Sequence, residues 1–395
     1  MVKATKTLKI PFLSLNQIKQ NLFASFQQIN TAVANEILAL PKDERSSLTS
    51  KHFRDVSIGS AWINQTIRNA NARTKVKQFR CLPLETNNQN WTLHRVGETY
   101  SLSFGLERGK RRRVPLEIHQ ASHADWLDAL LAGVAEPGSM KLWRSSKGIW
   151  SACISVTREV PEAAETDQWI GIDRGQNIPA VAGLPGGRGI FYKANEIRHL
   201  RKQFALRRKK LQKAGKHRAV KKLESRERRI VTHINHCLSK AIVGDARRLG
   251  LGIRLEDLSD IRKGMRQRKK TKSDASKNHD YWPFYQLETF IVYKATLGAV
   301  SVDEKKPPQY TSQMHWRCGH IGKRKGVHFY CANCDKHEHS DLNAGHNLRQ
   351  WDGTFCAVEP RSQAGDVMSS VAPSYGRYGN ALNCVNDGKP NGLPN

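Results

Sequence analysis

Three acidic residues constrain the fold of this chain most strongly, because each lies in or beside a short apolar segment. They are Asp173 in the segment 169–175, Glu256 in the segment 252–258 and Asp341 in the segment 339–344. An acidic residue at a strand end is most often a cap or turn residue. The chain carries a formal net charge of +30 and has a sequence pI of about 10.0. In so basic a chain, three such carboxylates in similar settings favour a shared cation site.

The positive charge of the chain points to a polyanionic partner, of which nucleic acid is the leading candidate. At 395 residues the chain is long enough for two or three domains with a sizeable core. A membrane surface would also attract this charge, but no apolar run reaches about 18 residues, so we expect no transmembrane helix. Residues 1–9 lack the pattern of a secretion signal. Of the eight cysteines three cluster and the rest are scattered, which favours a reducing cytoplasm over a disulfide framework.

The first half of the chain reads as a strand at 3–12, helices at 14–40 and 56–76, and then strands from 78 to 158. Apolar residues at helical spacing in the first helix, from Ile18 to Ile37, are interpreted as core packing. A short helix at 124–133 interrupts the strands, whose turns are rich in lysine and arginine. This pattern predicts a small antiparallel barrel or sheet, and residues 161–166 read as a linker.

The second half predicts an RNase H-like α/β core, because a hairpin-like run at 169–192 carries a carboxylate on its first strand. Helices follow at 196–213 and 219–249, then a strand at 251–258, a helix from 281 to about 297, a short strand at 300–303 and a last helix ending near 351. Residues 354–395 lack periodicity and are predicted to be a disordered tail.

Two basic segments of this half are candidate phosphate-contacting surfaces. From Arg198 to Arg229 there are fifteen Lys/Arg and two acidic residues. A charge run is usually a solvated face, but the apolar stripe here is narrow, which favours phosphate contact. The candidate residues are Arg207, Arg208, Lys209 and Lys210, with Arg262 and Lys263 in a basic loop at 262–272 that we expect to be mobile until it meets nucleic acid.

Two close pairs of metal-binding residue types predict a structural zinc site. His315 and Cys318 form one pair, and Cys331 and Cys334 form the other after twelve intervening residues. Two such pairs joined by a loop can present four ligands tetrahedrally, which leaves no open position for catalysis. Two alternatives remain, namely a knuckle held by packing without metal, or substitution for His315 by another histidine, from the set His320, His328, His337 and His339.

The three carboxylates suit a different ion. Carboxylate oxygens favour Mg²⁺ or Mn²⁺, which also retain positions for water and phosphate. A two-metal phosphodiester hydrolysis needs one shared carboxylate and further carboxylates for each ion. Asp173, on the first strand, is the candidate bridging ligand, with Glu256 and Asp341 completing the set.

Six short motifs, found in this order, carry a resemblance to a known family. They are Gly171-Ile-Asp173, Leu255-Glu256-Asp-Leu, Tyr310-Thr-Ser-Gln313, Cys318-Gly-His320, Cys331-Ala-Asn-Cys334 and Asp341-Leu-Asn-Ala344. Over roughly 168–352 the chain resembles the transposon-associated TnpB proteins and the compact type V CRISPR (Cas12) effectors. It departs from their pattern at His315, at Arg174 after the first carboxylate, and at Gly345-His346.

The resemblance implies an RNA-guided, Mg²⁺-dependent DNA endonuclease with a RuvC nuclease core and catalytic Asp173, Glu256 and Asp341. Its implied partners are a guide RNA and target double-stranded DNA in a bacterial or archaeal cytoplasm, at the nucleoid, with no membrane and with a homodimer as a further option. The implied order of parts is a wedge strand at 1–12, a helical recognition domain at 13–77, a wedge β-barrel at 78–166, the RuvC-like core at 167–309, a zinc-knuckle insert that binds target nucleic acid at 310–340, the RuvC C-terminal helix at 341–353 and the tail.

Base pairing would then read the target sequence, while the protein reads the duplex backbone and a short flanking motif. Basic residues of the first half are the candidates for that motif and the guide scaffold, namely Arg68, Arg73, Lys110, Arg111, Arg112 and Arg113. Arg317 is a candidate for phosphate near the cut. Two other functions stay open: an RNA-guided DNA-binding protein that blocks transcription without cutting, and an unguided RuvC-like nuclease or recombinase.

Overall fold

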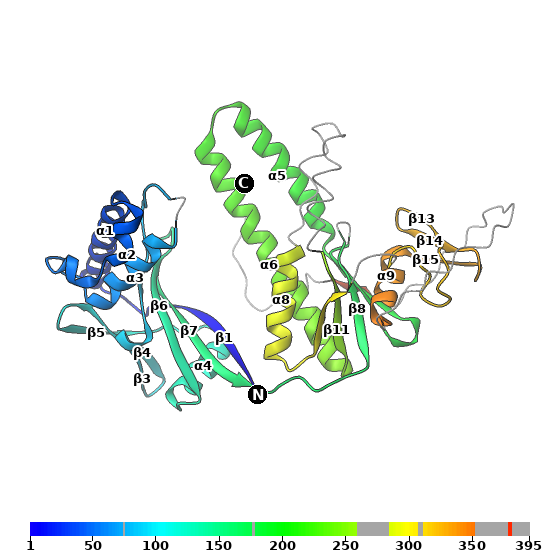
Figure 1. The fold of residues 1–395 in the computed structure, drawn as a ribbon, viewed down its shortest axis with the longest axis horizontal. Helices are drawn as coiled ribbons and strands as arrows, with labels where there is room; N and C mark the ends of the chain where they lie inside the picture. The colour runs from blue at the N-terminus through cyan, green and yellow to red at the C-terminus, as the bar shows by residue number, and fades with distance from the viewer. Residues whose placement is uncertain (74–75, 176–177, 259–283, 307–310, 352–377, 381–395) are drawn as a thin grey trace. The chain divides into compact units, whose positions relative to one another are not determined.

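The computed structural model describes residues 1–73, 76–175, 178–258, 284–306, 311–351 and 378–380. The chain divides into two compact units, Met1–Val160 and Pro161–Asn395 (Figure 1). The basic loop at 262–272, with Arg262 and Lys263, lies outside the described residues. Most of the predicted tail does too, but Tyr378–Asn380 form a short strand there, against the prediction. Among the described residues, no helix combines the length and the apolarity needed to cross a bilayer.

The first unit contains two antiparallel sheets. One sheet has the order β1 (Val2–Pro11), β7 (Trp150–Val160), β6 (Ala135–Arg144) and β2 (Leu84–Thr86). The other has the order β3 (Trp91–Val96), β4 (Thr99–Glu107) and β5 (Lys110–Pro115). Along β1, Leu8 and Ile10 are buried while Lys3 and Lys9 are exposed, which is the alternation of a strand with one face on the core. The predicted antiparallel strands are therefore confirmed.

Helices pack on these sheets around a cluster of aromatic side chains. They are α1 (Gln17–Ala39), α2 (Lys42–Ser47), α3 (Ser60–Asn71) and α4 (Ala121–Leu131), with short 3-10 turns at Ser50–Phe53 and Asn88–Asn90. Phe23 of α1 contacts Phe104 and Trp150, with ring centroids 6.0 and 5.5 Å apart. The core prediction fails at Ile18, which is 77% exposed because it lies in the first turn of α1, off the buried face. The predicted helix at 56–76 is shorter than expected and ends at Asn71.

The second unit is built on a mixed sheet with the order β12-β11-β8-β9-β10-β16. The strands are β8 (Trp169–Asp173), β9 (Ala180–Gly183), β10 (Gly189–Lys193), β11 (Gly252–Glu256), β12 (Val302–Lys306) and β16 (Tyr378–Asn380). β8, β9 and β10 form an antiparallel meander, with the 3-10 turn Pro185–Gly187 between the last two. β11 pairs in parallel with both β8 and β12. The structure thus has the mixed α/β architecture that the carboxylate-bearing meander predicts.

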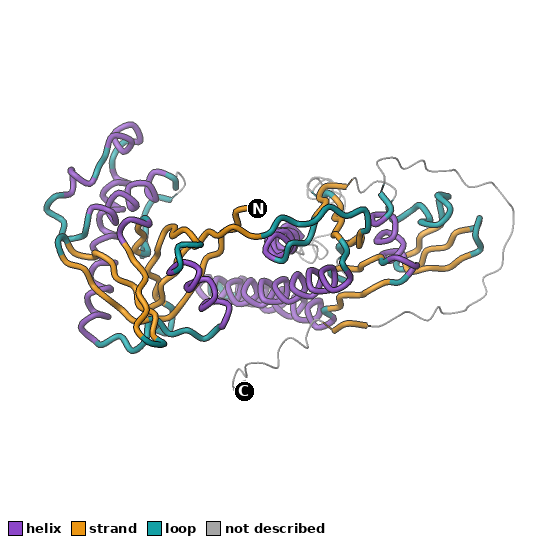
Figure 2. The backbone as a smooth tube through the Cα atoms, turned by 90° about the horizontal axis from the view of Figure 1, so that it is seen from below, coloured by secondary structure: helices purple, strands orange, loops and turns teal. Residues whose placement is uncertain are grey.

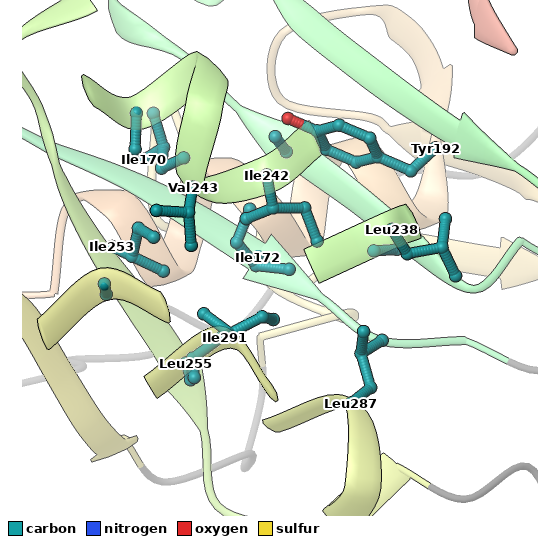
Figure 3. Close-up of a cluster of buried hydrophobic side chains, with 14 of the residues drawn as sticks. Ile170, Ile172, Tyr192, Leu238, Ile242, Val243, Ile253, Leu255, Leu287 and Ile291 are labelled. Atoms are coloured by element: carbon teal, nitrogen blue, oxygen red, sulfur yellow. The ribbon is translucent and has the colours of Figure 1, made fainter. Parts of the chain in front are cut away.

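Helices cover both faces of this sheet. α6 (His217–Leu249) and α8 (Phe284–Leu297) pack on one face and α9 (Ser340–Arg349) on the other, while α5 (Asn195–Lys213) packs on α6 (Figures 1 and 2). Figure 3 shows Ile172 and Leu255 of the strands beside Ile242 of α6 and Ile291 of α8, all four fully buried. The helix pair α5–α6 matches the predicted ranges, and its turn contains Gly215 at a φ of +64°.

The remaining helix, α9, lies directly on the backbone of β8 and β9. A methyl group placed on Gly171 would lie 2.1 Å from the carbonyl oxygen of Gly345, and one placed on Gly183 would lie 2.4 Å from the Gly345 carbonyl carbon. Only residues without a side chain allow so close an approach. A small three-stranded sheet, β13 (Lys323–Lys325), β14 (His328–Cys331) and β15 (Lys336–His339), leads directly into α9.

Candidate active site and metal centre

The structure brings Asp173, Glu256 and Asp341 together. Asp173 ends β8 and Glu256 ends β11, and the pairing of Ile172 with Leu255 sets the two acids side by side at one edge of the sheet. Asp341 lies in the first turn of α9, and its Oδ2 would be 3.8 Å from a methyl group on Gly175, two residues after Asp173. The glycine contacts beneath α9 therefore deliver the third carboxylate to the other two.

The electrostatics of this cluster favour a proton or a bound cation. Burial raises the pKa of Asp173 well above its ordinary range, and the charges of Glu256 and Asp341 raise it further. Burial also raises the pKa of Glu256, partly offset by Arg174 and by a hydrogen bond with Asp173. Carboxylates that repel one another in this way are stabilised when a divalent cation neutralises them. The donor set, all carboxylate oxygen, fits Mg²⁺ or Mn²⁺.

Arg174 holds the strand that carries Glu256. Its side chain is fully buried, and its guanidinium donates to the Glu256 carbonyl oxygen and to the Glu288 carboxylate of α8. One residue thereby ties β8, β11 and α8 together beside the carboxylates. In the sequence Arg174 stood out only as a departure from the family pattern, because its partner Glu288 lies 114 positions away.

A second arginine, Arg324 of β13, contacts the cluster and was missed by the sequence analysis. Its Nη2 lies 3.3 Å from Oδ1 of Asp341, and its Nε donates to the Gly326 carbonyl oxygen at 3.1 Å. The sequence Lys323-Arg-Lys325 is uniformly basic and gave no signal that singled Arg324 out. Arg317, the candidate for phosphate near the cut, stacks on Trp316 with 4.4 Å between the guanidinium carbon and the ring centroid, and its contact with phosphate stays a prediction.

The local backbone orients Asp341. Its N–H donates to Nδ1 of His339, which caps α9, at 3.2 Å, and its Oδ1 accepts from the Ser340 hydroxyl at 3.2 Å. His339, one of the alternative zinc donors, therefore serves as a helix cap. The N-terminus of a helix also favours a negative charge at Asp341.

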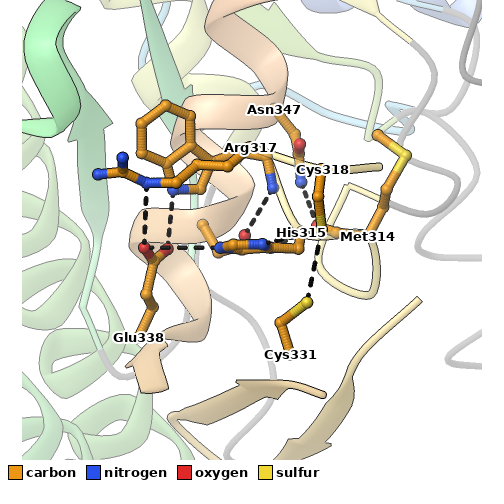
Figure 4. Close-up of polar contacts among 9 residues, drawn as sticks. Met314, His315, Arg317, Cys318, Cys331, Glu338 and Asn347 are labelled. Carbon is orange, nitrogen blue, oxygen red and sulfur yellow. Dashed lines mark hydrogen bonds and ion pairs between the residues drawn. The ribbon is translucent and has the colours of Figure 1, made fainter. Parts of the chain in front are cut away.

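The predicted zinc ligands form a compact group. The ligand atoms of His315, Cys318, Cys331 and Cys334 all lie within 4.8 Å of one another, and Figure 4 shows the first three of these residues. His315 Nδ1 is 3.2 Å from the Cys318 sulfur, which is 3.5 Å from the Cys331 sulfur. Two thiolates on one tetrahedral zinc would lie roughly 3.8 Å apart, from Zn–S bonds of about 2.3 Å. The group could therefore hold zinc, with His315 rather than another histidine as the fourth donor.

The thiols of this group differ in acidity. Burial opposes ionisation of Cys318, but hydrogen bonds from the His320 backbone, His315 and the other two thiols lower its pKa to about 6. Burial raises the pKa of Cys331 to about 12. A thiolate at Cys318 thus shares its charge with neighbouring thiols, and a divalent metal would neutralise this arrangement.

Comparison with known proteins agrees with this geometry. The family model for the Cas12f1-like TNB domain matches residues 284–348, from α8 to α9. A CRISPR-associated endodeoxyribonuclease Cas12f1 of Syntrophomonas palmitatica is 30% identical over 218 residues, covering 50% of this chain and 42% of that protein. A TnpB-like protein of Methanocaldococcus jannaschii is 28% identical over 160 residues, covering 39% of this chain and 56% of its own. Part of the chain is therefore similar to TnpB-like and Cas12f1 proteins, and its residues 284–348 match the Cas12f1-like TNB domain.

A likeness in fold extends over most of the chain. A cryo-EM structure of a Cas12f1–sgRNA–target DNA complex aligns with a TM-score of 0.65 at 13% identity, covering 88% of this chain and 99% of that one. At this identity the likeness concerns the fold alone. The chain spans about half the length of the curated relatives that it matches in sequence.

The predicted nucleic-acid candidates fall into two groups. Lys110 and Arg112 of β5 pair with Glu107, while Arg111 and Arg113 contact Ser103 and Ser101 across the sheet. Arg68, Arg73, Arg207, Lys209 and Lys210 are exposed, and Arg208 pairs with Glu227 of α6. The exposed cations of α5 are the better placed to meet phosphate, because fewer internal partners compete for them.

Proposed function

We propose that this chain is an RNA-guided DNA endonuclease that hydrolyses phosphodiester bonds at Asp173, Glu256 and Asp341. The observation that carries the proposal is the convergence of these three carboxylates at one sheet edge, in a chain with a net charge of +30. The charges of Glu256 and Asp341 raise the pKa of the buried Asp173, and a bound cation would relieve this repulsion. A strongly basic chain around them suits polyanionic substrates.

The arrangement of the second unit supports a RuvC-like assignment. An antiparallel meander continued by two parallel strands places two of the acids on neighbouring strand ends, as an RNase H-like core requires. We assign 167–309 and 341–353 to this core, and 310–340 to a zinc-knuckle insert. In the first unit we assign 1–12 and 78–166 to the wedge and 13–77 to recognition, in line with the family likeness.

The residues of the site would divide the work as follows. Mg²⁺ or Mn²⁺ ions, when bound, activate a water molecule and stabilise the leaving oxygen. Asp173, which feels the charges of both other acids, would hold the ions together with Glu256 and Asp341. Arg174 fixes the backbone at Glu256, and the His339 cap with the Ser340 hydroxyl fixes Asp341. The chain would thus hold its ligands ready before substrate arrives.

The guide RNA and the target DNA are part of the proposal. The exposed cations of α5, with those of α6, would contact the phosphate backbone without reading sequence. Such contacts release counterions, so binding would weaken steeply as salt concentration rises. Arg68, Arg73 and the Lys110–Arg113 strand remain candidates for the guide scaffold and the flanking motif.

Three linked measurements test the proposal. The chain is expressed with its native flanking DNA, the copurified RNA is sequenced, and the purified complex is incubated with a plasmid bearing a matching target, with Mg²⁺ or with EDTA. We expect a discrete RNA and cleavage that requires Mg²⁺. The Asp173→Ala variant should keep its RNA and bind target DNA but not cut it.

Each failure would point to a different conclusion. Absence of a discrete copurified RNA would overturn the proposal that the chain is guided by RNA. RNA-loaded protein that binds the plasmid but leaves it intact would identify a binding protein rather than a nuclease. Normal cleavage by Asp173→Ala would refute the site assignment.

A further inference from the structure

A carboxylate outside the metal-binding group faces three successive residues of the knuckle. Glu338 of β15 accepts a hydrogen bond from Trp316 Nε1 at 2.8 Å, and its other oxygen lies 3.7 Å from His315 Nε2 and 4.0 Å from Arg317 Nε (Figure 4). The Glu338 side chain is only 20% exposed. A half-buried carboxylate with this set of neighbours is placed to orient the loop that carries His315.

The two ring nitrogens of His315 face different partners. Nδ1 points to the sulfur of Cys318, and Nε2, which is buried without a hydrogen-bond partner, faces Glu338. A neutral imidazole that binds metal through one nitrogen carries its proton on the other, and a carboxylate is a common acceptor for that proton. A cysteine at this position would have no second nitrogen to orient. The role of Glu338 therefore depends on His315.

The same loop packs on α9, the helix that carries Asp341. The Trp316 ring stacks on His346, with ring centroids 4.4 Å apart, and the backbone N–H of Trp316 donates to Asn343 Oδ1 at 3.1 Å. Asn343 and Asn347 each donate to the Met314 carbonyl oxygen at 2.7 Å. Glu338 itself precedes Asp341 by three residues in continuous chain. The knuckle and the carboxylate cluster are therefore mechanically joined.

We propose that Glu338 is a positioning residue for the knuckle metal: it holds His315 with Nδ1 toward the thiolates and thereby couples metal binding to the position of α9. The effect on zinc affinity is independent of whether the chain cuts DNA. The effect on the position of Asp341 rests on the proposed function only if it is measured through DNA cleavage.

The first test measures zinc affinity of the full-length chain by competition with a chromophoric chelator. Glu338→Gln preserves the shape and the acceptor for Trp316, but the charge facing Nε2 is lost. We expect a 10- to 100-fold loss of zinc affinity, the usual range when an outer partner of a metal ligand is removed. Glu98→Gln, at a side chain that is 96% exposed, is the matched control and should not change the affinity.

A double-mutant cycle separates orientation of His315 from a general effect on folding. In the His315→Cys background, Glu338→Gln should lower zinc affinity by less than about threefold, because a thiolate offers no second nitrogen. An equal loss in both backgrounds would overturn the proposal, as would no loss in the natural background or a chain that binds no zinc.

The second test follows the coupling to α9. Hydrogen exchange of the 340–349 amides should slow when zinc is added to the natural chain, and should slow less in Glu338→Gln at equal zinc occupancy. If zinc leaves this exchange unchanged in the natural chain, the coupling is wrong. If exchange responds while no variant or natural chain cuts DNA, the nuclease proposal fails and the positioning role of Glu338 stands.

Discussion

Replacing Asp173 by asparagine should stabilise the metal-free protein while abolishing its response to Mg²⁺. Burial is the largest factor that opposes ionisation of Asp173, and the charges of Glu256 and Asp341 oppose it further. Asparagine has nearly the same shape and can still donate a hydrogen bond to Glu256. The substitution therefore removes a charge that the metal-free fold does not favour, and little else. Such gains in stability at the expense of activity are common where a site stores unfavourable charge.

The size and the pH dependence of this effect follow from linkage. A carboxyl pKa that is raised by folding lowers the free energy of unfolding once the group is ionised, by about 1.4 kcal/mol for each pKa unit. Relief of unfavourable charge typically gains roughly 0.5–2 kcal/mol, which corresponds to about 1–8 °C in Tm for a domain of about 150–250 residues. Because the folded pKa of Asp173 is raised, the natural chain loses stability as pH rises above the ordinary aspartate value of about 3.9. The advantage of Asp173→Asn should thus be small near pH 4 and should grow as the pH rises.

Thermal unfolding between pH 5 and 8, with EDTA or with millimolar Mg²⁺, measures both effects. Mg²⁺ should raise the Tm of the natural chain, since a ligand that binds only the folded state stabilises it, and should leave the variant unchanged. Asp125→Asn is the control, because its carboxylate is 61% exposed and pairs with Arg158, so a change within about 0.5 kcal/mol is expected. A lower Tm for Asp173→Asn in EDTA at pH 8, or equal stabilisation of both proteins by Mg²⁺, would refute the reasoning.

Three further outcomes are expected. Arg174→Met should lower the free energy of unfolding, measured in urea, by about 3–5 kcal/mol, because it leaves the Glu288 carboxylate and the carbonyl of residue 256 without their donor. A loss below 1 kcal/mol would show that Arg174 does not hold β8, β11 and α8 together. Arg324→Ala should tighten Mn²⁺ binding to the DNA-free chain several-fold, as measured by calorimetry, because the guanidinium 3.3 Å from Asp341 Oδ1 competes with the ion for that oxygen. Weaker binding would show that Arg324 supports the site instead. Replacing Arg207, Lys209 and Lys210 together by alanine should reduce the slope of log binding constant against log salt concentration for guide RNA by about 2–3. An unchanged slope would show that the phosphate contacts are made by other residues.

The carboxylates were predictable from the sequence because apolar runs mark where strands end. In β8 the residues before Asp173 are all apolar or small, and in β11 only Arg254 interrupts the apolar and small residues before Glu256, as expected for central strands with both faces covered. The candidate zinc ligands were predictable for a different reason, since close pairs fix two donors by local geometry alone. Ile18 shows the limit of periodicity: it fits the helical spacing, but spacing does not tell where the partner surface stops.

Contacts between residues far apart in the chain could not be predicted from the sequence. Arg174 follows Asp173, yet its work depends on Glu288 in another helix, and Arg324 reaches Asp341 only because the knuckle strands fold back onto α9. The sequence also did not show that β4 places Glu107 beside Lys110 and Arg112, which stay candidates for binding nucleic acid. A charge run reveals its sign but not its neighbours, so internal pairing decides which cations remain available to a ligand.

Asp341 differs from the other two acids in what holds it in place. Asp173 and Glu256 sit on hydrogen-bonded neighbouring strands and cannot separate without opening the sheet. Asp341 sits on a helix, and the repulsion that raises the pKa of Asp173 acts to push that helix away when no cation is bound. Backbone contact of Gly345 with β8 and β9 and the knuckle loop packed on α9 both oppose this push. The third carboxylate therefore depends on a folded knuckle in a way that the first two do not, which is why a cysteine-rich insert belongs directly before it in the chain.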